Sequence, residues 1–154
     1  MIEVKVIDRE AITYLVNGLE DFEKDKAIKD GLKAGGNVIQ SGGKRRLRSA
    51  MKKPGGVTGN LLRSFHVRPK RFKLGVLVGF RRSNKNMVIG GGNHAHLVDM
   101  GTGKRYWKTR GRKYVGVMPA NRFWSDTESQ DGNQAINEVY SGVERAVDKI
   151  KNRR

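Results

Sequence analysis

Positive charge in this chain is concentrated in one stretch, and this feature most limits how the chain can fold. Residues 44–113 hold twenty of the thirty-two Lys and Arg residues but a single acid, Asp99. The stretch therefore carries a net charge of +19, whereas residues 1–43 sum to −2 and residues 114–154 to zero. A segment this basic repels itself in isolation. We expect it to face an anionic molecule or a partner that neutralises it.

The length and composition suit one small domain that spans residues 1–154. The chain is 36% hydrophobic and has no cysteine, so we expect a modest core without disulfides or thiolate metal sites. No apolar run approaches the roughly 20 residues that cross a bilayer, and the N-terminus lacks the order of a secretory signal. We expect a soluble protein that is made in a cytoplasm and has no membrane partner.

Apolar periodicity predicts helices at both ends of the chain. Residues 2–7 alternate like a short edge strand, and Asp8 is a candidate N-cap for the helix that follows. Apolar residues at helical spacing then continue to Phe22. A second helical stretch, 28–51, contains five glycines, each of which weakens a helix by about 1 kcal/mol relative to Ala. This predicts a bent or broken helix.

Alternating apolar residues predict a β-hairpin over residues 64–80, with its turn at 69–71. One strand face would carry Phe72, Leu74, Val76, Val78 and Phe80. Residues 94–100 suit either a helix or a strand, and 114–117 suit a strand. After Pro119 a long helix follows, which 131–133 could interrupt. The predicted fold is therefore α+β: an antiparallel sheet of about four strands, packed by the long N-terminal helix and the C-terminal helix.

Two basic, flexible loops are predicted at about 81–93 and 101–113. Their cations lie close in sequence to Tyr106, Trp107 and Tyr114, and aromatic rings of this kind can stack on bases or anchor a protein interface. The cations could bind phosphates or an acidic neighbouring subunit. A protein interface is the interpretation that we favour because no nucleic-acid-binding motif is evident. The candidate residues are Arg81, Arg82, Lys85, Lys104, Arg105, Lys108, Arg110, Arg112 and Lys113.

His94, His96 and Asp99 could suggest a metal site, to which His66 could add a ligand. Their spacing argues against one, because Asp99 leaves the face of the two histidines on a strand, and on a helix the histidines diverge by about 160°. The chain also lacks a thiol nucleophile and a Gly-x-Ser-x-Gly motif. We therefore assign no metal, cofactor or catalytic residue, and a metal-dependent nuclease is a less favoured alternative.

Three short segments carry a family resemblance. Residues 58–65 resemble a T-G-x-L-x-x-S motif, residues 94–102 a Y-A-x-x-V-E-x-G-T motif, and residues 118–123 a P-x-x-P-F motif. In this order they are similar to the neck and tail-completion proteins of tailed bacteriophages, typified by the gene-ten product of a lambdoid phage. The sequence departs from the motifs at His94, at Asp99 and at the missing second proline.

The resemblance implies a structural protein of the virion that forms a ring of identical subunits at the head–tail junction. Its partners would be copies of itself and other head–tail junction or tail proteins, and a basic ring lumen could face passing double-stranded DNA. The implied activity is not enzymatic. A sequence-nonspecific nucleic-acid-binding protein is the alternative function. The matching motif positions, which we expect to be structural, are Gly59, Leu61, Asp99, Gly101, Thr102, Pro119 and Phe123.

Two of these positions carry specific expectations. Gly59 can permit a sharp turn into the hairpin, because a side chain would crowd it. Asp99 is expected to pair with a nearby Arg or to accept hydrogen bonds from the Gly101–Thr102 backbone.

Overall fold

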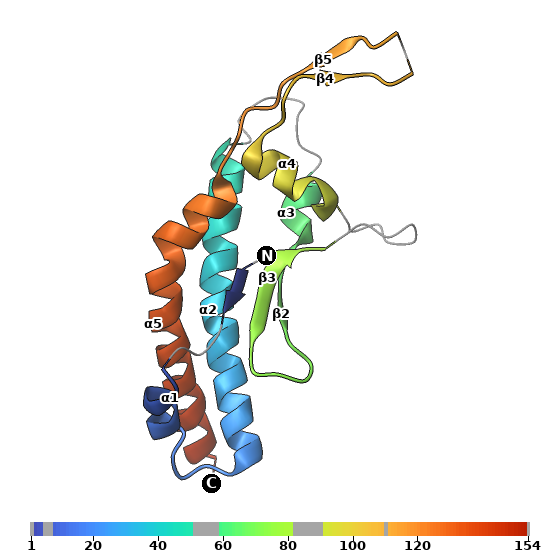
Figure 1. Cartoon of the computed structure of the whole chain (residues 1–154). Coiled ribbons are helices and arrows are strands. Elements are labelled where there is room, and N and C mark those ends of the chain that lie inside the picture. Colours follow the sequence, from blue (N-terminus) through green and yellow to red (C-terminus); the bar gives the residue numbers. More distant parts are fainter. Residues whose placement is uncertain (1, 5–7, 51–58, 82–90, 110, 154) are drawn as a thin grey trace.

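Two long helices lie side by side along the molecule, and a small antiparallel sheet packs on one of them (Figure 1). The computed structural model describes residues 2–4, 8–50, 59–81, 91–109 and 111–153. Helix α2 spans Asp21–Ala50 and helix α5 spans Phe123–Lys151. The mixture of helices and antiparallel strands confirms the predicted α+β class.

Helix α2 is continuous, so the predicted bend or break is wrong. Its glycines lie where neighbouring elements come too close for a side chain. On one side, a β-carbon at Gly31 would lie 2.6 Å from the Val139 carbonyl oxygen of α5, and one at Gly35 would lie 2.7 Å from that of Ala135. The absence of side chains thus lets the backbones of α2 and α5 approach closely.

Gly42 faces Asp131 of α5, whereas Gly36 and Gly43 face the sheet. A β-carbon at Gly36 would lie 2.9 Å from Val67, and one at Gly43 would lie 2.5 Å from the Phe65 ring. Helix α2 is therefore packed on two sides. The tertiary contacts that this close packing allows offset a helix-propensity cost of about 1 kcal/mol per glycine.

Strands β1 (Ile2–Val4), β2 (Phe65–Pro69) and β3 (Val76–Phe80) form a sheet in the order β1-β3-β2. The predicted edge strand and hairpin are confirmed, with all strand pairs antiparallel. The hairpin loop is longer than predicted, because pairing ends at Pro69 and Val76. As a result, Phe72 is 92% exposed rather than part of a strand face. Leu74 also lies in the loop and is exposed.

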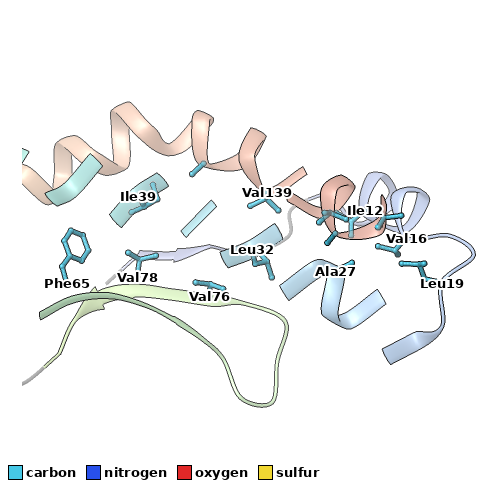
Figure 2. Close-up of a cluster of buried hydrophobic side chains, with 14 residues drawn as sticks. Ile12, Val16, Leu19, Ala27, Leu32, Ile39, Phe65, Val76, Val78 and Val139 are labelled. Atoms are coloured by element: carbon cyan, nitrogen blue, oxygen red, sulfur yellow. The ribbon is translucent and has the colours of Figure 1, made fainter. Parts of the chain in front are cut away.

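The core fills the space between α2, the sheet and α5 (Figure 2), and helix α1 (Arg9–Leu15) closes one end of it. The backbone N–H of Ala11 donates to Asp8 Oδ1 at 3.1 Å, which confirms the predicted N-cap. Ile12, Val16 and Leu19 are buried as their spacing predicts. Phe22 is 72% exposed, because α1 ends at Leu15 and a turn precedes α2.

The remaining elements lie at the opposite end from α1 (Figure 1). They are α3 (Asn60–Ser64), the 3-10 turn η1 (Gly92–His94), α4 (Ala95–Met100), β4 (Arg105–Tyr106) and β5 (Tyr114–Gly116). Strands β4 and β5 pair only with each other, so the described strands form a three-stranded and a two-stranded sheet instead of one sheet of four. Helix α5 runs through 131–133 without the predicted interruption.

Candidate interaction surface

The three segments with family motifs come together at one end of the sheet. Gly59 has a φ of +70°, which favours glycine, and forms a turn into α3. No atom lies within 4 Å of an added β-carbon, so the expected crowding is wrong. The Arg81 N–H donates to the Ser64 carbonyl at 2.8 Å, and the Gly92 N–H donates to the Arg81 carbonyl at 3.0 Å. These bonds tie α3, the end of β3 and η1 together. Leu61 is partly buried on α3.

An aromatic cluster joins the same segments through their side chains. The Phe65 and Phe80 rings stack with centroids 4.5 Å apart, and Phe123 meets Phe80 edge-on at 5.8 Å. Trp124 lies 5.5 Å from Phe65. Phe123 is 1% exposed. The cluster therefore fixes the start of α5 against the hairpin.

Asp99 caps helix α5. Its Oδ1 accepts the backbone N–H of Trp124 at 2.7 Å, and its Oδ2 accepts the Ser125 hydroxyl at 3.3 Å. The expectation that Asp99 bonds an Arg or the Gly101–Thr102 backbone is wrong. Helix α5 starts after Arg122, which has a φ of +56° and provides no side-chain cap, so a carboxylate from α4 satisfies the first turn.

Gly101 and Thr102 form the base of a β-ribbon. Gly101 has a φ of +75°, and a β-carbon there would lie 2.7 Å from the backbone nitrogen of Ala120. The Thr102 N–H donates to the Met118 carbonyl at 2.8 Å, while its hydroxyl accepts the Met118 N–H at 3.0 Å. Pro119 follows and is exposed. The motif residues thus clamp the two chain segments from which β4 and β5 extend.

The ribbon, residues 101–109 and 111–117, projects beyond α4, away from the helices (Figure 1). Tyr106 pairs with Tyr114, and the Trp107 N–H donates to the Lys113 carbonyl at 2.9 Å. The sequence predicted a flexible loop over 101–113, but residues 105–106 instead pair with 114–116. Short strands next to a basic turn leave too little periodicity for a sequence prediction.

The ribbon presents both aromatic and cationic side chains to solvent. Tyr106, Trp107 and Tyr114 are 54%, 50% and 53% exposed. Residues 101–117 contain six Lys and Arg residues and no acid. An exposed aromatic surface surrounded by positive charge is a composition typical of binding surfaces.

The structure gathers five of the nine predicted basic residues onto this ribbon. Arg81 is separate from them, since it lies at the end of β3 beside η1. Arg82, Lys85 and Arg110 lie outside the described residues, as does most of the predicted loop at 81–93. The five exposed ribbon cations are Lys104, Arg105, Lys108, Arg112 and Lys113.

Sequence reasoning missed an ion pair between the two long helices. The Arg46 guanidinium on α2 contacts both carboxylate oxygens of Asp131 on α5, at 2.5 and 3.0 Å, and also donates to Gln130 and Thr127. The hydrogen bond from Arg46 lowers the pKa of Asp131 below its usual range, although burial acts in the opposite direction. The same hydrogen bond raises the pKa of Arg46. An acid at an inward-facing position of a predicted helix is a weak sequence signal for such a pair, because buried acids are usually paired.

The three residues weighed as metal ligands do not form a common site. His94 and His96 are exposed, whereas the Asp99 carboxylate is engaged with α5. The described parts of the chain contain no group of three or more His, Asp or Glu residues that could hold a metal ion. Within the same parts, no helix is both long and apolar enough to span a membrane.

Comparison with known families agrees with the motif resemblance. The pattern that defines one family of phage structural proteins matches residues 9–109, and its description reads "Bacteriophage HK97-gp10, putative tail-component". This chain belongs to that HK97-gp10-like family. The match includes the motif segments at 58–65 and 94–102 and ends within the ribbon. Comparisons with curated proteins and with solved structures give no significant match. A tail-component family supports a structural role in the virion.

Proposed function

We propose that this protein forms a ring of identical subunits at the head–tail junction and joins the phage head to the tail. The ribbon of residues 101–117 is the observation that carries this proposal. Its exposed Tyr106, Trp107 and Tyr114 are the residue types that anchor protein interfaces. The role is one of assembly, without catalysis.

The proposed contact joins unlike surfaces of neighbouring subunits. The ribbon lies at one end of the molecule, and α1 with the first turns of α2 lies at the other (Figure 1). Residues 8–30, which we name the acidic end, contain seven acids and four bases. Its exposed acids are Asp8, Glu10, Glu20, Asp21, Asp25 and Asp30.

A basic arm that docks on the acidic end of the next copy is a heterologous contact, and such contacts close into a ring when the rotation allows. Opposite charges would favour this pairing over the contact of two ribbons. The ribbon is anchored through Gly101, Thr102 and Met118, so it would be held ready for the neighbouring copy.

The size of the purified assembly tests the ring. Sedimentation velocity of the wild-type protein at increasing concentration should give a closed oligomer of fixed mass. The variant Lys108→Glu/Lys113→Glu should remain monomeric, because it reverses charge on the ribbon. The matched variant Lys33→Glu/Arg48→Glu reverses two exposed charges on α2, outside the ribbon and the acidic end, and should assemble normally. A wild-type protein that stays monomeric at every concentration would contradict the ring.

The joining role is tested separately in the phage that encodes the protein. A stop codon early in the gene should yield filled heads and free tails that electron microscopy finds apart. Supplying the wild-type protein should restore joined particles, while the ribbon variant should not. Complete virions without the protein would overturn the proposed function.

A further inference from the structure

We propose that the loop of the β2–β3 hairpin, residues 68–74, is a binding site for the phosphate backbone of double-stranded DNA. The site is distinct from the ribbon and from the predicted basic loops. It deepens the proposed function by adding DNA as a partner, and it rests on an element that the subunit contact does not use.

The loop is held open as a defined structure. Pairing ends at Pro69 and Val76, and the Lys70 N–H donates to the Gly75 carbonyl at 2.9 Å, which closes the base of the loop. The Lys70 ammonium forms an ion pair with Glu3 of the neighbouring edge strand. Residues 68–73 line a hollow of about 560 Å³. Lys70 therefore fixes the loop, and the other cations are left to face solvent.

Three of those cations are available for a ligand. Arg68, Arg71 and Lys73 are all exposed. In the part of the chain that the structure describes, no carboxylate forms an ion pair with any of the three. Cations that are neither neutralised nor buried attract a polyanion, and a flexible Lys or Arg can follow successive phosphates.

Phe72 gives the loop a second kind of contact. It lies between Arg71 and Lys73 and is 92% exposed, the most exposed of the large hydrophobic residues that the structure describes. An apolar side chain among phosphate-binding cations can press against sugars or into the minor groove, as the wedges of many DNA-binding proteins do. An exposed Phe with unpaired cations on both sides can therefore contact the sugars and the phosphates of one DNA backbone together.

The position of the loop allows both contacts in one subunit. Figure 1 shows that the hairpin loop and the β4–β5 ribbon point in opposite directions along α2. The face of the sheet behind the loop packs on α2 through Val67, Val76 and Val78 beside Gly36. The loop belongs neither to the ribbon nor to the acidic end, and we expect it to stay exposed when the ribbon docks on a neighbour.

DNA binding is measured by fluorescence anisotropy with a labelled 30-base-pair duplex and the full-length protein, at 50 to 200 mM salt. Each phosphate contact makes the plot of log affinity against log salt steeper by about 0.9. The variant Arg71→Ser/Lys73→Ser should therefore flatten the slope by about 1.8. Phe72→Ala should lower affinity at every salt concentration and leave the slope unchanged, since it removes no charge.

Two matched variants locate the site. Lys33→Ser/Arg48→Ser removes the same charge from α2 and should bind DNA with the wild-type slope. Met100→Ala removes another exposed apolar side chain and should bind with the wild-type affinity. The proposal is overturned if the wild-type protein does not bind the duplex at 50 mM salt. It is also overturned if the α2 variant, rather than the loop variant, flattens the slope.

Sedimentation of the same variants separates this proposal from the ring. The loop variants should assemble like the wild-type protein while they lose DNA affinity. If they lose assembly and keep DNA binding, the loop contacts protein and the DNA site is wrong, whereas the ring proposal survives. If the wild-type protein binds DNA through the loop but never assembles, the ring proposal fails alone.

Discussion

Two buried carboxylates hold the first half of α5 in place. Asp99 reaches from α4 to the first turn of the helix, and Asp131 meets Arg46 of α2 two turns later. Each satisfies groups that would otherwise be left buried without a partner. The family motif contains the first acid, whereas the second lies beyond all three motif segments.

Replacing the capping carboxylate should weaken α5 at its start. We predict that Asp99→Ala lowers the free energy of unfolding by about 1 kcal/mol, the typical cost of losing an N-cap. Asp99→Asn should cost less because its amide oxygen can still accept the Trp124 N–H. Urea unfolding at neutral pH measures both. Equal stability of Asp99→Ala and the wild-type protein would show that the cap is not needed.

The Arg46–Asp131 pair should make stability depend on acidic pH. The hydrogen bond from Arg46 holds the pKa of Asp131 below its unfolded value of about 3.9. The pair therefore stabilises the fold above that pH, and this contribution is lost as the pH falls through the lower, folded pKa. The acid branch of the stability profile should thus begin near pH 4.

Asp131→Asn isolates this contribution. Since the Asp131 side chain is 8% exposed and that of Arg46 17%, the loss at pH 7 should be about 3 kcal/mol, as for other buried pairs that lose one partner. Urea unfolding should show that the difference in the free energy of unfolding between Asp131→Asn and the wild-type protein is smaller at pH 2 than at pH 7. A difference that does not change with pH would contradict the assignment.

At the scale of elements, the glycines of α2 are packing positions. Gly42 lies against Asp131, and a β-carbon there would overlap its carboxylate. We predict that Gly42→Ala destabilises the protein despite the better helix propensity of Ala. Gly132→Ala, with no atom within 4 Å of the added carbon, should stabilise it by about 1 kcal/mol. Thermal unfolding compares the two, and a stabilising Gly42→Ala would be incompatible with this packing.

The elements whose side chains repeat were predictable from the sequence, because the repeat itself reports the buried face. The Asp8 cap, the hairpin strands and the long C-terminal helix belong to this group. The continuity of α2 could not be predicted in this way, because the effect of Gly31 or Gly36 depends on how closely another element approaches. The pairing of Arg105–Tyr106 with Tyr114–Gly116 was also missed, because these strands are too short to show a period.

At the scale of the whole molecule, charge composition located the candidate surface only in part. It identified the cations and aromatic residues of 101–117, but not that they form one arm, nor that Arg81 lies apart from it. Neither did it distinguish the loop at 68–74, where a turn was expected. Both distinctions depend on where β-pairing ends, which the backbone hydrogen bonds decide.

The proposed ring depends on the contact between the ribbon and the acidic end. Because the chain has no cysteine, engineered disulfides can measure this contact directly. Thr109→Cys places one thiol on the ribbon, and Lys26→Cys places one on the acidic end; both positions are exposed. When a tagged and an untagged variant are mixed and oxidised, we predict disulfide dimers that join Thr109→Cys to Lys26→Cys. Dimers of like variants only, or no dimers at all, would contradict the head-to-tail contact.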